Sequence, residues 1–157
     1  MFRIGFSEDI HKKQEGCKLV LAGIEFPGEI GLLGHSDADV ICHAVAESIL
    51  GALALGDLGK HFPDNDLKYA GISSLFLLDQ VVGMMRKEGF KVSNLDVQVS
   101  CKSPKLADKI LDMRKSLAEH LKTSVSNVSV KACSYNGVGP IGNGEAIKAS
   151  AYVLLEK

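Results

Sequence analysis

Alternation of apolar and polar residues with a period of two predicts several β-strands, because successive side chains of a strand point to opposite faces of its sheet. The clearest alternation lies in residues 95–101, where Leu95, Val97 and Val99 are separated by polar residues. Related patterns bounded by turn residues predict further strands at 2–10, 18–26, 128–132 and 145–155.

Helical spacing of apolar residues predicts three helices. The first runs to about residue 50, with Ser36 or Asp37 as a suitable N-cap. The second spans 73–88 and is ended by Gly89. The third runs from Ser103-Pro104 to about residue 121, with Ser103 as cap and Pro104 in the first helical position. Residues 56–69 form a long loop, and loops of this length are often functional.

The resulting order, β-β-α-loop-α-β-α-β-β, predicts an α/β (α+β) fold in which a single layer of helices covers a mixed β-sheet. A length of 157 residues fits one domain, 1–157. The last strand is largely apolar on both faces, with Ala149, Ala151 and Val153 on one face and Tyr152 and Leu154 on the other. Such a strand is buried either in the interior or against another subunit.

Composition narrows the classes of function. A formal charge of −1 gives no electrostatic reason to expect nucleic acid or an anionic membrane as partner. The chain has no apolar run of the roughly 20 residues that span a bilayer, and its first residues lack a signal-peptide pattern. Four widely spaced cysteines without a Cys-x-x-Cys pair argue against a zinc ribbon or a disulfide scaffold. We therefore expect a cytoplasmic protein with neither nucleic acid nor membrane as partner.

Asp9-Ile10-His11 is the first candidate for metal chemistry. Residues two apart in a strand share a face, so the Asp9 carboxylate and the His11 imidazole converge on one point. This pair suits zinc, whose catalytic sites take three protein ligands and leave one position open. The triplet is also common by chance.

His35-Ser36-Asp37-Ala38-Asp39 and His43 place two imidazoles and two carboxylates around the predicted start of the first helix. His43 lies one turn after Asp39 and is the natural third metal ligand. The competing interpretation is that the serine and the carboxylates only cap the helix, where its dipole favours negative charge.

Two further motifs remain ambiguous, and a third is rejected. Ser103-Pro104-Lys105 could hold a phosphate at a helix N-terminus or could simply cap the helix. The segment 131–134 offers a cation, a thiol and a hydroxyl at the end of a strand. The glycines of 137–142 match a dinucleotide-binding pattern, but a strand follows them where that pattern requires a helix.

Taken in order, these stretches resemble the 2-C-methyl-D-erythritol 2,4-cyclodiphosphate synthase family. The resemblance covers nearly the whole chain and is carried by residues 9–11, 31–40 with His43, 51–64, 103–105, 130–132 and 142–145. The resemblance implies an α/β layer assembled as a homotrimer, with active sites between neighbouring subunits.

The reaction that the resemblance implies belongs to non-mevalonate isoprenoid biosynthesis. Its substrate is a small cytidine diphosphate compound, 4-diphosphocytidyl-2-C-methyl-D-erythritol 2-phosphate. The 2-phosphate attacks the β-phosphorus, which closes the 2,4-cyclodiphosphate and expels CMP, so the enzyme is a phosphorus–oxygen lyase. Because the nucleophile is part of the substrate, catalysis reduces to positioning and charge neutralisation.

The resemblance also implies site residues, by matching position. Zn²⁺ or another divalent cation would bind Asp9, His11 and His43, with Mg²⁺ or Mn²⁺ between the substrate phosphates. His35 and Ser134 would be catalytic, through hydrogen bonds to charge on the five-coordinate phosphorus. The implied substrate-binding residues are Ser36, Asp57, Gly59, Phe62, Asp64 and Asp66 beside the diphosphate and methylerythritol, and Ser100, Ser103, Pro104, Lys105, Ala107, Lys131, Cys133 and Asn136 beside the cytidine and its phosphates.

The chain departs from the family pattern at several of these positions. Asn136 stands where a glutamate usually helps to hold the second cation, so we expect a higher Mg²⁺ requirement. Cys133 replaces a threonine and is a weaker hydrogen-bond donor. Phe6, Glu8 and Asn143 differ around the trimer's central cavity, which in relatives can hold an isoprenoid diphosphate; we do not assign that role here.

The sequence leaves two alternatives to the cyclase open, and it does not fix the cyclase's cellular context. The chain could be a catalytically weakened nucleotide- or isoprenoid-binding trimer, which only Asn136 favours. A zinc hydrolase would need a general base and would release linear phosphates. A cyclase working beside a separate transferase differs only in its cellular context.

Overall fold

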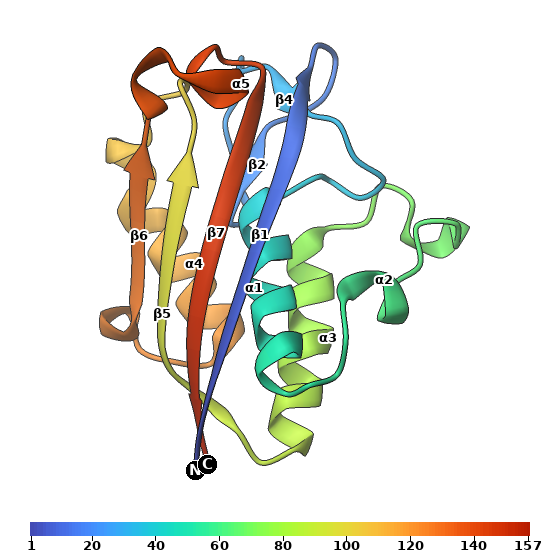
Figure 1. Ribbon diagram of the computed structural model, residues 1–157. Coiled ribbons are helices and arrows are strands. Elements are labelled where there is room, and N and C mark those ends of the chain that lie inside the picture. The colour runs from blue at the N-terminus through green and yellow to red at the C-terminus, as the bar shows by residue number, and fades with distance from the viewer.

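The computed structural model describes residues 1–157 and contains a five-stranded sheet of order β4-β1-β7-β5-β6 (Figure 1). Its strands are β1 (Phe2–Gln14), β4 (Gly31–Leu32), β5 (Lys91–Ser100), β6 (Val128–Cys133) and β7 (Ala146–Glu156). The β5–β6 pair is parallel, and the other neighbours are antiparallel. The sheet is therefore mixed, as the sequence predicts.

Three long helices lie on one side of the sheet: α1 (Val40–Ala52), α3 (Ser74–Lys87) and α4 (Ile110–Leu121). Helix α1 packs against β1 and β7, α4 packs against β6, and α3 packs against α1 and α4. Strand β1 lies so close to α1 at Gly5 that a Cβ atom added there would lie 1.8 Å from the Ser48 carbonyl oxygen. This contact brings the inward-facing side chains of β1 against α1.

The remaining elements are short. They are β2 (Val20–Leu21), β3 (Ile24–Glu25), α2 (Leu58–His61), α5 (Gly139–Gly142) and the 3₁₀ turns Leu67–Tyr69, Ala107–Lys109, Val125–Asn127 and Tyr135–Gly137. The expected loop 56–69 thus carries two short helical turns. The glycine-rich segment 137–142 holds only a short helix and leads into β7.

The single strand predicted at 18–26 is wrong. The chain reverses there, and β2 pairs with β3 as a short antiparallel hairpin. Ala22 and Gly23 form the turn with φ of 52° and 76°, a left-handed pair that suits a two-residue hairpin. Both of their N–H groups donate to the Asp39 carboxylate, at 2.9 and 2.7 Å, which holds the turn in place.

Two predicted helix starts are also wrong. The first helix begins at Val40 with Asp39 as its N-cap, because Ala38 has φ 56° and interrupts the helical path from Ser36 and Asp37. The third begins at Ile110, after a bend that includes a cis Ser103–Pro104 peptide and the turn Ala107–Lys109. Leu106 is buried within this bend, so the chain folds inward before the helix starts.

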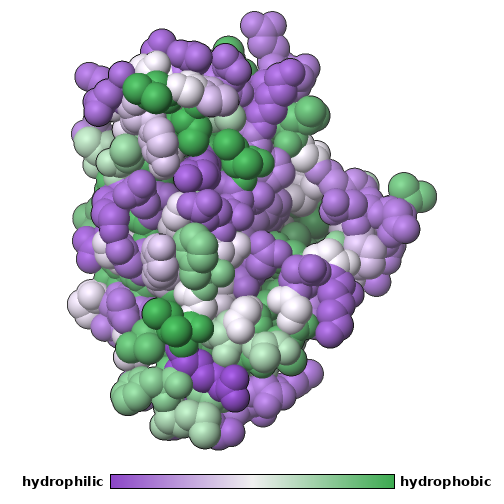
Figure 2. Space-filling view, in the orientation of Figure 1, coloured by the Kyte–Doolittle hydropathy of each residue, from purple (hydrophilic) through white to green (hydrophobic).

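No helix covers the opposite face of the sheet, which we call the bare sheet face. Alternate residues of β1, among them Ile4, Phe6 and Ile10, are 73%, 50% and 53% exposed, and Tyr152 of β7 is 51% exposed beside Phe6. Glu8 lies in the same row and accepts hydrogen bonds from Lys148 (3.2 Å) and Ser150 (2.9 Å). Figure 2 shows hydrophobic and hydrophilic residues mixed over the molecule in the view of Figure 1.

The two chain ends meet at one end of the sheet (Figure 1). The Met1 amino group donates to the Lys157 carbonyl at 2.8 Å, and the Lys157 N–H donates to the Met1 carbonyl at 3.0 Å. All four cysteines are free thiols, as their spacing predicts. None of the helices combines the length and the apolar character needed to cross a membrane.

Candidate metal centre and its cavity

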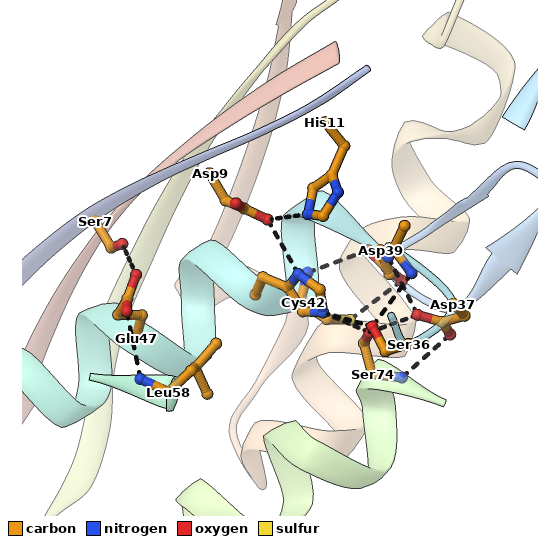
Figure 3. Close-up of polar contacts among 12 residues, drawn as sticks. Ser7, Asp9, His11, Ser36, Asp37, Asp39, Cys42, Glu47, Leu58 and Ser74 are labelled. Carbon is orange, nitrogen blue, oxygen red and sulfur yellow. Dashed lines mark hydrogen bonds and ion pairs between the residues drawn. The ribbon is translucent and has the colours of Figure 1, made fainter. Parts of the chain in front are cut away.

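The structure brings Asp9, His11 and His43 together. Asp9 Oδ2 lies 2.9 Å from His11 Nε2 and 3.0 Å from His43 Nδ1, and the ligand atoms of all three residues lie within 4.8 Å of one another (Figure 3). One carboxylate and two imidazoles form a donor set that suits zinc, with three protein ligands and an open position. The residues present therefore fit a divalent metal.

His11 is oriented by its second ring nitrogen. Nδ1 lies 2.7 Å from the Leu33 carbonyl oxygen, which can only accept a hydrogen bond. Nδ1 therefore carries a proton, and Nε2 faces Asp9. The hydrogen bond with Asp9 is the main cause that raises the pKa of His11, against the opposing effect of burial.

Asp9 is ionised despite its position. Burial favours the neutral acid, but the hydrogen bonds and charges of His11 and His43 outweigh it and hold the pKa of Asp9 well below its ordinary value. An ionised carboxylate is the form that binds a cation.

The local fold explains why these side chains meet. Inward-facing positions of β1 alternate with exposed ones, which directs Ser7, Asp9 and His11 toward α1. His43 stands at the end of α1 nearest these residues because Asp39 fixes the start of the helix. The Asp39 carboxylate is completely buried and accepts from the N–H of Cys42 at 3.1 Å as well as from the β2–β3 turn. Burial raises its pKa, against these backbone donors.

Asp37 caps a different helix from the one predicted. Its Oδ2 accepts from the Ser74 N–H at 3.1 Å, at the first turn of α3, and its Oδ1 accepts from the Ser74 hydroxyl and from the Asp39 N–H at 3.1 Å (Figure 3). A carboxylate at a helix N-terminus is favoured by the helix dipole. The segment before α1 is thereby tied to α3.

The metal group lies in a cavity of about 340 Å³. Eight of the predicted site residues line it: Asp9, His11, His35, Ser36, His43, Gly59, Phe62 and Asp64. Ser36 Oγ lies 3.0 Å from His43 Nε2, and His35 Nε2 lies 3.4 Å from the Asp66 carbonyl oxygen. The cavity therefore presents polar side chains next to the metal ligands.

Two predicted residues of this group have other positions. Asp57 is the N-cap of α2 and accepts from the Lys60 N–H at 2.9 Å. Asp66 is the N-cap of the turn Leu67–Tyr69 and accepts from the Lys68 N–H at 3.1 Å. Neither side chain lines the cavity, so both shape the loop that borders it.

The sequence interpretation missed Glu47, which lines the same cavity. Its Oε2 accepts from the Ser7 hydroxyl at 2.9 Å, and its Oε1 accepts from the Leu58 N–H at 3.3 Å (Figure 3). Glu47 thus links β1, α1 and the start of α2. Its position one turn after His43 on the same helix was the available signal. Tyr69 was also missed; its ring packs edge-on against Phe62 with centroids 5.5 Å apart.

The second group of predicted residues lies at the ends of β5 and β6. Ser100 and Cys133 are neighbours in the parallel pair, and the Cys101 N–H donates to the Cys133 carbonyl at 2.9 Å. Lys13 reaches across from β1 and donates to the carbonyl (2.7 Å) and hydroxyl (3.0 Å) of Ser103. The segments Ser100–Ala107 and 131–136 are therefore adjacent.

This second group is less complete than the first. Ser134 Oγ accepts from the Asn136 N–H at 3.3 Å, and Asn136 has φ 50°. Lys131 pairs with Asp96 instead of standing free, and the Ser100 hydroxyl is buried without a hydrogen-bond partner. Because no helix begins at Ser103, both helix-based interpretations of Ser103-Pro104-Lys105 are wrong. None of these residues lines the metal cavity.

Comparison with known proteins gives one consistent result. The model of the YgbB family matches residues 2–156. A 2-C-methyl-D-erythritol 2,4-cyclodiphosphate synthase from Brachyspira hyodysenteriae is 50% identical over 155 residues, which cover 99% of this chain and 98% of that protein.

Solved structures agree with the sequence matches. The bifunctional IspDF from Campylobacter jejuni superposes with a TM-score of 0.94 at 35% identity, covering 99% of this chain but only 42% of that longer chain. IspF from Plasmodium falciparum in complex with CDP superposes with a TM-score of 0.86 at 32% identity, covering 98% of this chain and 95% of that one.

Proposed function

The chain belongs to the YgbB family, whose matching relatives are 2-C-methyl-D-erythritol 2,4-cyclodiphosphate synthases, and we propose that it catalyses their cyclisation as a phosphorus–oxygen lyase. A 2-phosphate oxygen of 4-diphosphocytidyl-2-C-methyl-D-erythritol 2-phosphate forms a bond to the β-phosphorus. The bond from that phosphorus to the bridging oxygen breaks, and the oxygen leaves on CMP. Atoms and charge balance without any external reactant.

The metal group carries this proposal. Asp9, His11 and His43 would hold a Zn²⁺ or another divalent cation at the wall of the cavity. When bound, such a cation, together with a second divalent cation (Mg²⁺ or Mn²⁺) on the substrate phosphates, would supply Lewis-acid withdrawal of charge from the phosphate oxygens.

The chain's own residues position the substrate. Ser36 and His35 border the cavity beside the metal ligands and donate hydrogen bonds to the diphosphate. Gly59, Phe62 and Asp64, together with the loop shaped by Asp57 and Asp66, enclose the methylerythritol group. Holding both phosphates of one molecule in place supplies most of the rate advantage, because the reaction is already intramolecular.

The cytidine half of the site comes from the second group of residues. We propose that Ser100–Ala107, with Lys131, Cys133 and Asn136, binds the cytidine and its phosphates, and that Ser134 donates to the reacting phosphate. The complex of the Plasmodium relative with CDP supports a cytidine diphosphate ligand. Because these residues do not line the metal cavity of their own chain, we infer that the complete site requires a second copy.

A homotrimer meets that requirement. The bare sheet face supports it, since Ile4, Phe6, Ile10 and Tyr152 expose apolar side chains along two adjacent strands. Exposed apolar surface of this kind marks an interaction site. We further propose that residues 1–157 form one domain and act in the cytoplasm, in agreement with four free thiols.

Phosphorus NMR of the purified protein with the substrate, Zn²⁺ and a Mg²⁺ series tests the proposal. We expect the signals of the cyclic diphosphate and CMP. Linear phosphates would indicate a hydrolase instead. Unchanged substrate with retained CDP binding would indicate the binding-only trimer, which the assembled metal group does not favour.

A further inference from the structure

His43 is held on the side that faces away from Asp9. Its Nε2 lies 2.8 Å from Ser74 Oγ and 3.0 Å from Ser36 Oγ. Ser74 is the first residue of α3 and is completely buried, so this contact is shielded from water. His43 is therefore bonded through both ring nitrogens, one toward Asp9 and one toward α3.

The direction of the contact with Ser74 follows from counting protons. A serine hydroxyl has one proton to donate, and the Ser74 hydroxyl makes a short contact with Asp37 Oδ1, which can only accept. The Ser74 N–H donates to the other oxygen of the same carboxylate at 3.1 Å. Asp37 thus takes both donors of Ser74, and the Ser74 oxygen is left only to accept. Its nearer partner is His43 Nε2 at 2.8 Å, and the Ser36 hydroxyl lies farther away at 3.3 Å.

This arrangement decides which nitrogen of His43 can bind a metal. If Nε2 donates to Ser74, then Nε2 carries a proton, and the lone pair that remains for a cation is that of Nδ1. Nδ1 is the nitrogen that faces Asp9, at 3.0 Å. We propose that Ser74 and Asp37 are positioning residues, which fix the tautomer and ring orientation of His43 for the metal.

The proposal rests on the metal site of the proposed function and deepens it. A carboxylate can polarise a hydroxyl that in turn accepts a hydrogen bond from a ligand imidazole. This arrangement makes the imidazole a stronger metal ligand. The Leu33 carbonyl does the same for His11 through Nδ1. The two ligand histidines thus use opposite nitrogens, Nε2 of His11 and Nδ1 of His43, each fixed by a different outer partner.

Zinc affinity of the substrate-free protein tests this inference. Competition with a chromophoric chelator is expected to show about 10- to 100-fold weaker Zn²⁺ binding for Ser74→Ala and for Asp37→Asn. Ser48→Ala is the matched control, because Ser48 is another completely buried serine whose hydroxyl bonds only to the Val45 carbonyl. It is expected to bind Zn²⁺ like the parent chain.

Nitrogen-15 NMR of the zinc-bound parent chain gives an independent readout. We expect the His43 Nε2 signal of a protonated nitrogen and the Nδ1 signal of a metal-bound one. Zinc on Nε2, or zinc affinity in Ser74→Ala equal to that of Ser48→Ala, would overturn the proposal. Both measurements are made without substrate, so a failure of the cyclisation assay leaves them unaffected.

Discussion

The proposed metal half and the proposed cytidine half of the site differ in how completely one chain builds them. Asp9, His11 and His43 are half-buried, and each histidine has an outer hydrogen-bond partner, the Leu33 carbonyl for His11 and the Ser74 hydroxyl for His43. At the ends of β5 and β6, in contrast, the Ser100 hydroxyl is buried without a partner.

This difference shows what each half is prepared for. The metal ligands are arranged before any ligand arrives, which reduces the reorganisation needed on binding. In the proposed cytidine half, the Ser100 hydroxyl is fully buried and has no hydrogen-bond partner within its own chain. We interpret the first as a preformed centre and the second as a surface completed by the nucleotide and a neighbouring subunit.

Removing a metal ligand gives the largest expected effect. His43→Ala should abolish zinc binding and lower kcat/KM by about three orders of magnitude, as expected from the loss of several kcal/mol of charge stabilisation. His120→Ala is the matched control, because His120 pairs with Asp79 at 2.7 Å between α3 and α4. Zinc content and initial rates are measured for both variants. Full turnover by metal-free His43→Ala would contradict the metal's role.

Mixing two defective chains tests whether one site draws on two copies. Ser134→Ala alone is expected to lose about 100-fold in kcat, as for a lost oxyanion donor. After co-refolding with His43→Ala in equal amounts, about a quarter of the sites would combine two intact halves, and activity should recover to about a quarter of the parent value. No recovery in verified mixed trimers would place both halves in one chain.

Asn136→Glu addresses the second cation. The substitution should lower the Mg²⁺ concentration for half-maximal rate about tenfold, because a carboxylate binds Mg²⁺ better than an amide does. Since Asn136 has φ 50°, which glutamate tolerates less well, we also expect a loss of about 1–2 kcal/mol of stability. The dependence of the rate on Mg²⁺ concentration measures the first effect, and denaturant unfolding measures the second. An unchanged Mg²⁺ curve would show that residue 136 does not help to bind the second cation.

Lys13 provides the smallest expected effect. Lys13→Met removes the two hydrogen bonds to Ser103, and a loss of about 1 kcal/mol should weaken CDP binding about fivefold while zinc affinity stays constant. Lys12→Met, on the opposite face of β1, is the control. Equal CDP affinity in both variants, measured by calorimetry, would show that the Lys13 contact does not support the cytidine half.

The same contrast explains how far the sequence could predict the structure. Alternation in β1 placed Asp9 and His11 on one face, and helical spacing placed His43 near the start of α1, because both depend on local periodicity. The contact of His43 with Ser74 joins residues 31 positions apart and required the packing of α3 against α1. No local pattern contains that information.

The wrong element boundaries have the same origin. Asp39 holds the turn at Ala22 and Gly23, so a segment that reads as one strand becomes a hairpin. Leu106 is drawn into the core, so a segment with good helix-start residues becomes a bend. In both places tertiary contacts outweigh local propensity.

The N-terminus and the C-terminus of the chain lie side by side. With Met1 and Lys157 hydrogen-bonded to each other, a short linker could join them, and new ends could be opened in an exposed loop without changing the sheet order. Asp9 lies seven residues along β1 from Phe2, about 23 Å at the rise of a strand. A second catalytic domain fused to either end would therefore be attached well away from the metal ligands. Such a fusion is expected to leave the metal site undisturbed.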